Sequence, residues 1–332
     1  AYALSHIGHA RSAVAFDILV RLLRYKGYEV TFVRNFTDVD DKIIKRANDE
    51  GVSSTEIAET YIKAYHEDMD RLNVIRADIE PKATEHIQEM LNLTERLIAD
   101  GKAYATPSGD VYFRVRSFPG YGKLSGRTPD DLRSGARVVP GDEKEDPLDF
   151  ALWKSAKPGE PYWESPWGKG RPGWHIECSC ISMKYLGEHL DIHCGGIDNA
   201  FPHHTNEIAQ SEAYLGHPWC KYWVHIHHLN TNSGKMSKSK GEFLTVSLLE
   251  EKGYDPLVYR FFCLQSHYRK GLVFSWENLD NAAAAYTKLI ARIAALDPAD
   301  GPVDQEAMKP YREKFGQQMG NDLNTSMGVT AL

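Results

Sequence analysis

Residues 173–207 read GWHIECSCISMKYLGEHLDIHCGGIDNAFPHHTNE, and this stretch determines how the rest of the chain is interpreted. It contains a thiol at Cys178, an imidazole at His203 and a carboxylate at Glu207. Pro202 is suited to the first position of a helix, because its fixed φ angle matches the helical value. On such a helix His203 and Glu207 are four residues apart, so their side chains share one face.

These three side chains form a chemically sensible ligand set for zinc. Thiolate, imidazole and carboxylate are the groups that zinc binds, and fewer than four protein ligands leave a coordination position for a substrate. The alternative is a buried free cysteine next to a solvated helix face. Because such triples also arise by chance, this stretch alone does not decide between the two interpretations.

The segments next to these residues alternate between strand and helix patterns. Leu190–His193 is a short strand candidate, and Gly195 and Gly196 connect it to Asp198 and the next helix. A strand that leads through glycines into a helix places Asp198 at the carboxyl edge of a sheet, where ligands bind in open α/β folds. We therefore predict a protein of the α/β class with a parallel sheet.

The beginning of the chain shows the same alternation. Residues 5–11 read SHIGHAR and run directly into a segment of helical periodicity, which is followed by a strand-like run at 28–33. His6 and His9 therefore lie at a helix N-terminus, where free N–H groups and the helix dipole favour an anion. Gly8 allows a base or a phosphate to approach the backbone closely. Taken alone, the tetrapeptide His6-Ile7-Gly8-His9 is more often an incidental turn.

Residues 101–173 differ in composition from the segments on either side. Glycine, proline and charged residues dominate, as in FPGYGKLSGRTPDD at 118–131. We interpret this region as an insertion between two halves of a sheet. Periodicity and end signals predict further helices at 40–50, 53–72, 84–99 and 281–296, another helix starting at Asp255-Pro256, and strands at 111–115, 150–153 and 222–227.

Residues 233–241 read SGKMSKSKG and form a cationic segment. Lysines among serines and glycines suit a polyphosphate ligand, because such a loop presents several charged donors at once. A solvated basic loop is the alternative, and it is favoured when the segment is considered alone.

The composition excludes several classes of protein. The chain has 332 residues, more than one ordinary core, so two or three modules are expected. Its five cysteines are sparse and odd in number, which favours a reducing compartment, and we predict a cytoplasmic protein. No apolar run is long enough to span a membrane. A net charge of -7 argues against a broad nucleic-acid-coating surface, although not against a local basic groove.

Read in order, the motifs resemble those of class I aminoacyl-tRNA synthetases. His6-Ile7-Gly8-His9 and the KMSKS run at 235–239 match the two signature motifs of that class. GRPGWHIEC at 170–178, the GGxD element at 195–198 and FPHHxNE at 201–207 are similar to the cysteinyl-tRNA synthetase family. So is NFTDVDDKIIKRA near the start of the chain, and the likeness extends over essentially the whole sequence.

The resemblance implies a Rossmann-type catalytic domain that is split by a connective insertion. It also implies a stem-contact fold and an α-helical bundle after the catalytic domain, and an anticodon-binding domain beyond Leu332. The implied boundaries are 1–100 and 173–230 for the two catalytic halves, 101–172 for the insertion, 231–275 for the KMSKS loop with the stem-contact fold, and 276–332 for the start of the bundle.

The resemblance also implies roles for individual residues. Cys178, His203 and Glu207 match three of the family's four zinc ligands, and the fourth is a cysteine expected in a segment before Ala1. The residues that match ATP-binding positions are His6, Gly8, His9, Gly196 and Lys238, and those that match catalytic positions are His6, His9, Lys235 and Lys238. The residues that match positions around the aminoacyl pocket are Thr37, Trp174, His193 and Asp198.

The function implied by the resemblance is that of a cysteine–tRNA ligase. Such an enzyme activates L-cysteine with ATP and Mg²⁺, transfers it to tRNA(Cys), and recognises the substrate thiol through zinc. We expect a monomer, and we expect Arg260, Arg269 and Lys270 to contact tRNA phosphates. One rival is the mycothiol-pathway cysteine ligase, which joins cysteine to glucosaminyl-inositol and lacks the carboxylate ligand represented here by Glu207. A non-catalytic zinc or RNA-binding module is the other, and the intact signature motifs argue against it.

Overall fold

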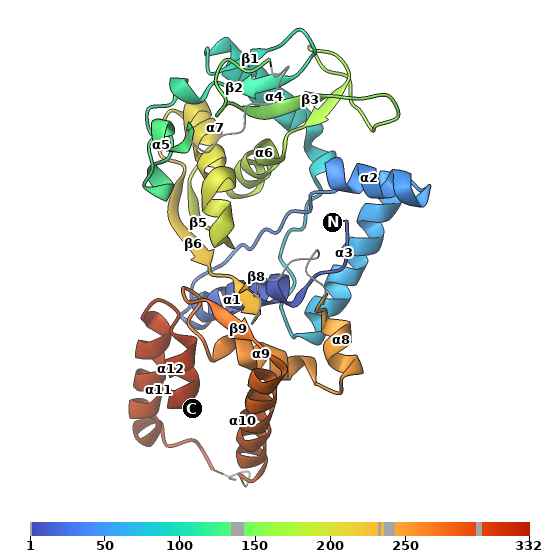
Figure 1. Ribbon diagram of the computed structural model, residues 1–332. Helices are drawn as coiled ribbons and strands as arrows, with labels where there is room; N and C mark the ends of the chain where they lie inside the picture. Colours follow the sequence, from blue (N-terminus) through green and yellow to red (C-terminus); the bar gives the residue numbers. More distant parts are fainter. Residues whose placement is uncertain (1, 134–142, 232–233, 236–242, 297–300) are drawn as a thin grey trace. The chain divides into compact units, whose positions relative to one another are not determined.

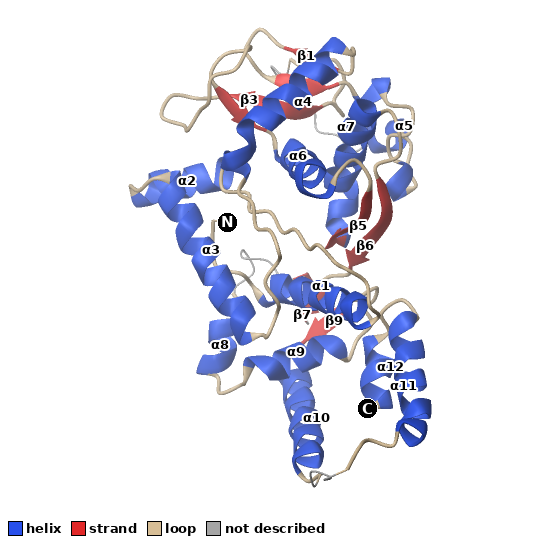
Figure 2. Cartoon of the chain, turned by 180° about the vertical axis from the view of Figure 1, so that it is seen from behind, coloured by secondary structure: helices blue, strands red, loops and turns tan. Residues whose placement is uncertain are grey.

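The computed structural model describes residues 2–133, 143–231, 234–235, 243–296 and 301–332 (Figure 1). The chain divides into two compact units. The first unit contains residues 1–3, 31–63 and 77–224, and the second contains residues 4–30, 64–76 and 225–332. Helices dominate both units, and the strands are short (Figure 2). No helix in the described ranges is long and apolar enough to cross a membrane.

The first unit combines an antiparallel sheet with helices that carry the metal-ligand candidates. Its sheet has the order β1-β2-β3-β4, and all neighbouring strands are antiparallel. The strands are β1 (Ala103–Ala105), β2 (Val111–Phe113), β3 (Phe150–Ser155) and β4 (Gly170–Pro172). The other elements are α2 (Asp41–Glu50), α4 (Ile87–Ala99), α5 (Pro129–Arg133), α6 (Trp174–Leu186), β5 (Leu190–Gly196), α7 (Thr205–Leu215) and β6 (Cys220–Ile226), whose last two residues belong to the second unit.

The core of the first unit lies where α4, α6 and α7 pack near the antiparallel sheet. Met90, Phe113, Trp153 and Ile176 are completely buried in one hydrophobic cluster. Because α6 and α7 both contribute to this cluster, the side chains that they carry are held on a rigid base. That base fixes Cys178 on α6 relative to Glu207 on α7.

The second unit is built around its first helix, α1 (Ile7–Tyr25). Ile7 and Val14 of α1 pack against Tyr259 and Phe262 in one hydrophobic cluster. Strand β7 (Leu229–Thr231) is parallel to β9 (Leu272–Phe274) and antiparallel to β8 (Gly234–Lys235). The remaining helices are α8 (Val246–Glu251), α9 (Pro256–Leu264), α10 (Trp276–Ala294), α11 (Gln305–Gly320) and α12 (Thr325–Ala331). Helix α3 (Ser54–Arg71) begins in the first unit and ends in the second.

Several predicted helix ends are confirmed. Ser53 and Glu56 form the expected capping box at the start of α3, with Ser53 N 2.9 Å from Glu56 Oε2 and Glu56 N 3.1 Å from Ser53 Oγ. Asp255 caps α9 by accepting a hydrogen bond from Leu257 N at 2.8 Å. The helix predicted at 281–296 is α10, which begins earlier, after its cap at Ser275.

The predicted α/β class is correct, but the strand predicted at 28–33 is wrong. Strand β7 pairs in parallel with β9, and Val33–Ile79 and Phe36–Lys82 form isolated parallel bridges. The backbone N–H of Phe32 donates to the Asp78 carboxylate at 2.7 Å, while its carbonyl oxygen accepts from the backbone N–H groups of Asp78 and Ile79. A side-chain acceptor therefore replaces part of the ladder, and the segment is extended without forming a strand.

Candidate metal centre and nucleotide-signature residues

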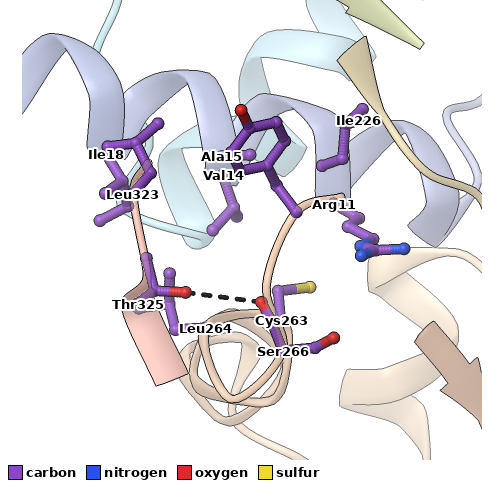
Figure 3. Close-up of a pocket in the computed structure, with 11 residues that line it drawn as sticks. Arg11, Val14, Ala15, Ile18, Ile226, Cys263, Leu264, Ser266, Leu323 and Thr325 are labelled. Atoms are coloured by element: carbon purple, nitrogen blue, oxygen red, sulfur yellow. Dashed lines mark hydrogen bonds between the residues drawn. The ribbon is translucent and has the colours of Figure 1, made fainter. Parts of the chain in front are cut away.

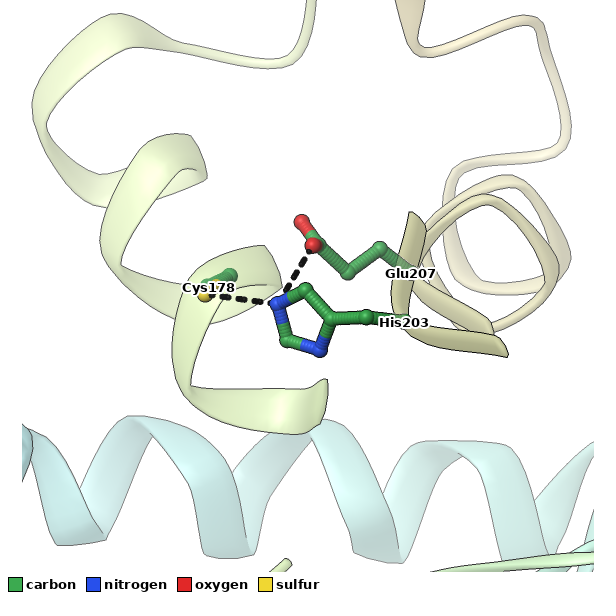
Figure 4. A group of neighbouring side chains, drawn as sticks. All are labelled: Cys178, His203 and Glu207. Carbon is green, nitrogen blue, oxygen red and sulfur yellow. Dashed lines mark hydrogen bonds and ion pairs between the residues drawn. The ribbon is translucent and has the colours of Figure 1, made fainter. Parts of the chain in front are cut away.

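The structure brings together the three residues that were predicted to bind zinc (Figure 4). His203 Nε2 lies 3.5 Å from Cys178 Sγ and 2.9 Å from Glu207 Oε1. Their possible ligand atoms all lie within 4.8 Å of one another, which is the scale of one coordination sphere. Cys178 comes from α6, Glu207 comes from α7, and His203 comes from the turn that leads into α7. Helix packing therefore completes a cluster that is spread over 30 positions of sequence.

The turn before α7 is wider than an ordinary helical turn. Residues 200–204 form a π-type turn, and Phe201 within it has non-helical φ and ψ angles. Thr205 Oγ1 donates to Ala200 O at 2.7 Å and closes the turn. Widened turns of this kind often occur at functional sites because they redirect one side chain out of the regular helical series. Here His203 and Glu207 remain on one face, as the four-residue spacing predicted.

Glu207 is a buried carboxylate with only one of its oxygens hydrogen-bonded. Its Oε2 accepts from His193 Nε2 at 2.9 Å. Its Oε1 lies near His203 Nε2 but has no aligned hydrogen-bond partner among the described residues. Burial raises the pKa of Glu207, but His193 and His203 together hold this pKa well below its usual range. A buried, ionised carboxylate with an unsatisfied oxygen fits a cation at this position.

The thiol at Cys178 leads to the same conclusion. Burial, followed by the nearby carboxyl groups of Glu207 and Glu177, raises the pKa of Cys178 well above its usual value. Without a cation the sulfur is therefore protonated, and a bound metal would stabilise the thiolate. Asn35 Nδ2 lies 3.6 Å from the sulfur and is a weak donor to it. The donor set of sulfur, nitrogen and carboxylate oxygen thus fits zinc.

Aromatic rings surround this cluster. Trp174 stacks on His203 with ring centroids 3.9 Å apart and an interplanar angle of 20°, and 48% of Trp174 is exposed. His175 Nδ1 lies 2.7 Å from His203 Nδ1 on the side away from Glu207. Burial, followed by His203, lowers the pKa of His175 to about 3, so this ring is neutral.

The pocket residues predicted in the first unit lie at different distances from the metal cluster. His193 contacts Glu207 directly, and Trp174 covers His203. Thr37 Oγ1 donates at 2.7 Å to Glu177, the residue before Cys178, and burial raises the pKa of Glu177 well above its usual value.

The predicted glycine–aspartate element ends β5. Gly196 is the last residue of β5, and Asp198 lies in the short turn that follows. A Cβ at Gly195 would lie 2.6 Å from the ring of His204, so a side chain at this position would displace that histidine.

Sequence reasoning missed two histidines of this site. His175 contacts His203, and His204 forms a second possible metal-binding group with His193 and Glu207. The signal was present in the WHIEC and PHHTNE runs. The sequence does not show which of two neighbouring histidines faces inward, because that depends on the widened turn before α7.

In the second unit, the first signature motif forms the start of α1. His6 Nδ1 accepts from His9 N at 3.2 Å and caps the helix, and the two rings stack with centroids 3.7 Å apart. A Cβ at Gly8 would lie 2.9 Å from the His6 ring, so glycine allows this ring to fold back over the helix. Lys235 contributes its backbone to β8, whereas the predicted site residue Lys238 lies outside the described residues.

A buried arginine anchors the same helix. Arg11 donates to the carbonyl oxygens of His227, His228 and Lys270 at 2.8, 2.7 and 2.6 Å. Burial lowers the pKa of Arg11, but three acceptors replace much of its hydration. These three hydrogen bonds join the helix that begins in the first signature motif to the segment that leads into β7 and to the backbone at Lys270.

Arg11 also lies at one end of a small apolar pocket. Figure 3 shows Val14, Ile18, Leu264 and Leu323 around it. Cys263 also lines this pocket, and burial raises the pKa of its thiol to about 12. Cys263 therefore packs as a small apolar side chain in the hydrophobic cluster of the second unit.

The predicted phosphate contact at Arg260 does not fit its position. Only 12% of its side chain is exposed, and Nη2 is 2.5 Å from Asp17 Oδ2. Its Nη1 donates to the carbonyl oxygens of Leu72 and Asn73. Arg269 is exposed and pairs with Asp322 at 2.5 Å, which leaves it at the surface where a phosphate could compete. Arg260 is therefore an internal structural residue, and Arg269 is the better candidate.

Comparison with known proteins adds independent information. The family described as "tRNA synthetases class I (C) catalytic domain" matches residues 1–284. A protein of Nitratidesulfovibrio vulgaris named "Cysteine--tRNA ligase" is 58% identical over 339 residues, covering 99% of this chain and 70% of the relative. A protein of the same name from Lawsonia intracellularis is 57% identical with the same coverage. The chain thus spans about 70% of the length of these relatives.

Solved structures show a similar fold. The methionyl-tRNA synthetase of Mycobacterium tuberculosis bound by methionyl-adenylate is similar with a TM-score of 0.69 at 16% identity, over 99% of this chain and 79% of that one. A Campylobacter jejuni protein described as a putative arginyl-tRNA synthetase is similar with a TM-score of 0.59 at 14% identity, over 99% and 81%. At these identities the likeness concerns the fold alone.

Proposed function

The chain belongs to the cysteine–tRNA ligase family of class I aminoacyl-tRNA synthetases, and on that premise we propose that it selects its amino acid at the cluster of Cys178, His203 and Glu207. The reaction is the ATP-dependent attachment of L-cysteine to tRNA(Cys). The observation that carries the proposal is the buried Oε1 of Glu207, which faces the thiol and the imidazole but has no hydrogen-bond partner among the described residues.

Specificity for cysteine follows from the chemistry of this cluster. Cys178, His203 and Glu207 would hold zinc together with the cysteine that the family resemblance implies before Ala1. When bound, zinc supplies a soft coordination position that a thiolate fills far better than a hydroxyl. Trp174 and His193 lie against these ligands and would limit the space around the substrate. Serine, which differs by one atom, would then be rejected.

The chemical step needs positioning and charge stabilisation more than a protein nucleophile. The substrate carboxylate attacks the α-phosphorus of ATP, pyrophosphate leaves, and the 3′-terminal ribose of tRNA then displaces AMP. We propose that His6, His9 and the N-terminus of α1 bind the nucleotide, and that Lys235 and Lys238 stabilise phosphate charge with Mg²⁺. Gly8 and Gly196 would leave room for ATP. Thr37 and Asp198 would complete the amino acid pocket.

We also propose a domain assignment. The antiparallel sheet β1–β4 lies within residues 101–172, which supports a separate connective insertion. The parallel bridges at residues 33–36 and 79–82, with the β5–β6 pair, would belong to the Rossmann-type halves at 1–100 and 173–230. Residues 231–275 would form the KMSKS loop and the stem-contact fold, and 276–332 would begin the helical bundle. A cytoplasmic monomer remains our prediction.

One experiment tests the proposed function against its rival. ATP–pyrophosphate exchange is measured with each amino acid, using this chain extended upstream by the cysteine-bearing segment of the family. Only cysteine should support rapid exchange. The enzyme with its cysteinyl-adenylate is then given either tRNA(Cys) or glucosaminyl-inositol as the acceptor. Cysteine should be transferred to the tRNA. Transfer to the amino sugar without charging of tRNA would identify the mycothiol-pathway ligase instead.

A further inference from the structure

His203 has close contacts at both ring nitrogens. Its Nε2 faces Cys178 and Glu207 within the cluster that we propose to hold zinc. Its Nδ1 lies 2.7 Å from Nδ1 of His175, a distance at which two ring nitrogens share one proton. Sequence reasoning had given His175 no role.

Metal binding determines where the shared proton must lie. A histidine that binds a metal through Nε2 needs the lone pair on that atom, so its proton must be on Nδ1. In this geometry His203 Nδ1–H donates and His175 Nδ1 accepts. His175 must then carry its own proton on Nε2. With the opposite arrangement, in which His175 donates, the proton of neutral His203 would lie on Nε2 and point at the metal.

The position of His175 is fixed by three elements. It lies on α6, one turn before Cys178, so the same helix carries a ligand and the residue that contacts another ligand. Its ring packs edge-on against Phe150 of β3 with centroids 5.5 Å apart. Its carbonyl oxygen accepts from Gln210 Nε2 of α7 at 2.5 Å. These contacts hold the ring in place before a metal arrives.

We propose that His175 is a positioning residue of the metal centre, which accepts the Nδ1 proton of His203 and so directs the lone pair of Nε2 towards the metal. This inference rests on the zinc centre proposed above. Outer partners of this kind fix both the tautomer and the orientation of a ligating imidazole, and their loss typically weakens metal binding by about 10–100-fold.

Zinc affinity of three His175 variants tests this role. The parent and the variants are prepared free of metal, with the upstream cysteine-bearing segment present, and titrated with zinc against a chromophoric chelator. His175→Leu removes the acceptor and should weaken zinc binding by about 10–100-fold. His175→Asn places an amide oxygen near the position of Nδ1 and should retain affinity to within a few-fold. His175→Gln, whose acceptor lies one carbon farther out, should bind more weakly than His175→Asn.

Controls separate this role from a change in folding. His217→Gln replaces a histidine outside the metal cluster, which contacts the carbonyl oxygen of Pro218, and should bind zinc like the parent. Cobalt substitution gives a second measurement, because a misoriented imidazole changes the ligand-field bands. If His175→Leu does not fold, the comparison of asparagine with glutamine decides the question.

Each outcome has a distinct meaning. Parent-like zinc affinity in His175→Leu, or equal affinities in the asparagine and glutamine variants, would overturn the role of His175 and leave the metal centre intact. A parent protein that binds no zinc would overturn the metal centre itself, and the role of His175 with it.

Discussion

Two carboxylates, Asp17 in the second unit and Glu207 in the first, are almost equally buried, with exposed fractions of 1% and 0%. Asp17 is well supplied with partners. It pairs with Arg21 at 2.9 Å and with Arg260 at 2.5 Å, and it accepts from Ile75 N at 2.8 Å. Glu207 has a hydrogen bond from His193 on one oxygen, and its other oxygen has none among the described residues.

The difference separates a structural cluster from the proposed metal site. Around Asp17, the positive charges and the N–H group are provided by the chain itself, so the group is satisfied when the protein folds. Around Glu207, the neighbours are imidazoles and a thiol, which are metal ligands in their deprotonated forms. A buried carboxylate that the fold leaves partly unsatisfied is what we expect where a cation binds. Equal burial therefore does not mean equal roles.

The largest expected effect lies at Glu207. Removal of the metal by chelation, or Glu207→Gln, should abolish the preference for cysteine over serine, which we expect to exceed ~10⁴ in the parent because a site built for one polar group strongly rejects the analogue that lacks it. The measurement is ATP–pyrophosphate exchange with both amino acids. Glu188→Gln, which changes an exposed carboxylate of the same unit, should leave the ratio unchanged. If the metal-free enzyme still preferred cysteine over serine to the same extent, zinc would not be the group that recognises the thiol.

The next effect concerns stability at Asp17. Asp17→Asn leaves the guanidinium of Arg260 buried without its counter-charge, and breaking such a pair costs about 3–5 kcal/mol in the free energy of unfolding. Urea denaturation at neutral pH measures this loss in the free energy of unfolding. Glu207→Gln in the metal-free protein is the matched comparison, because it changes an equally buried carboxylate. We expect a clearly smaller loss at Glu207, because its neighbours there are not permanent charges. Equal losses would remove the distinction between the two clusters.

A further rate effect is expected at Lys238, which the sequence places in the second signature motif. Lys238→Ala should slow adenylate formation by roughly 10²–10³, the usual loss when one preorganised charge-stabilising group is removed. Zinc affinity and cysteine affinity should stay close to those of the parent, since the proposed metal ligands are Cys178, His203 and Glu207. Pre-steady-state adenylate formation and zinc titration measure the two quantities. An unchanged rate of adenylate formation would mean that this motif is only a solvated basic loop.

The sequence predicted local features of this fold well. Helix starts at Ser53 and Asp255 followed from side chains that bond to backbone N–H groups within three residues, and such bonds are encoded locally. The pairing of His203 with Glu207 followed from helical spacing. The position of Cys178 beside them could not be predicted from spacing, because α6 and α7 meet through tertiary packing. It followed only from the chemistry of zinc ligands and from the family resemblance.

The features that could not be predicted depend on distant partners. Arg260 was expected at the surface, but its partner Asp17 lies 243 positions away in sequence. His175 and His204 stand next to predicted residues, yet their contacts depend on where α6 meets the widened turn before α7. The strand expected at 28–33 was wrong for a related reason. Phe32 N donates to the side chain of Asp78, 46 positions away in sequence, and Val33 forms only an isolated bridge.

A third charged cluster surrounds Arg171. It differs from the clusters at Asp17 and Glu207 because its carboxylate is exposed. The side chain of Arg171 is only 5% exposed, but that of its partner Asp41 is 66% exposed and also contacts Lys154 at 3.1 Å. Burial raises the pKa of Asp41, but the bonds from Lys154 and Arg171 outweigh it and lower the pKa overall. Water screens a pair with one exposed partner, so Asp41→Asn should cost less than about 1 kcal/mol at pH 7.

The pH dependence of this variant follows from the sign of the shift. Because the pKa of Asp41 is lower in the folded state, its ionised form contributes stability above the ordinary aspartate pKa of about 4. That contribution should disappear as the pH falls through the lowered folded value, so parent and Asp41→Asn should converge in acid. Urea unfolding at pH 7 and at about pH 3, each with and without added salt, measures the difference. A loss as large as that of Asp17→Asn, or one that persists in acid, would mean that burial of the arginine alone sets the strength of the pair and that exposure of its partner does not matter.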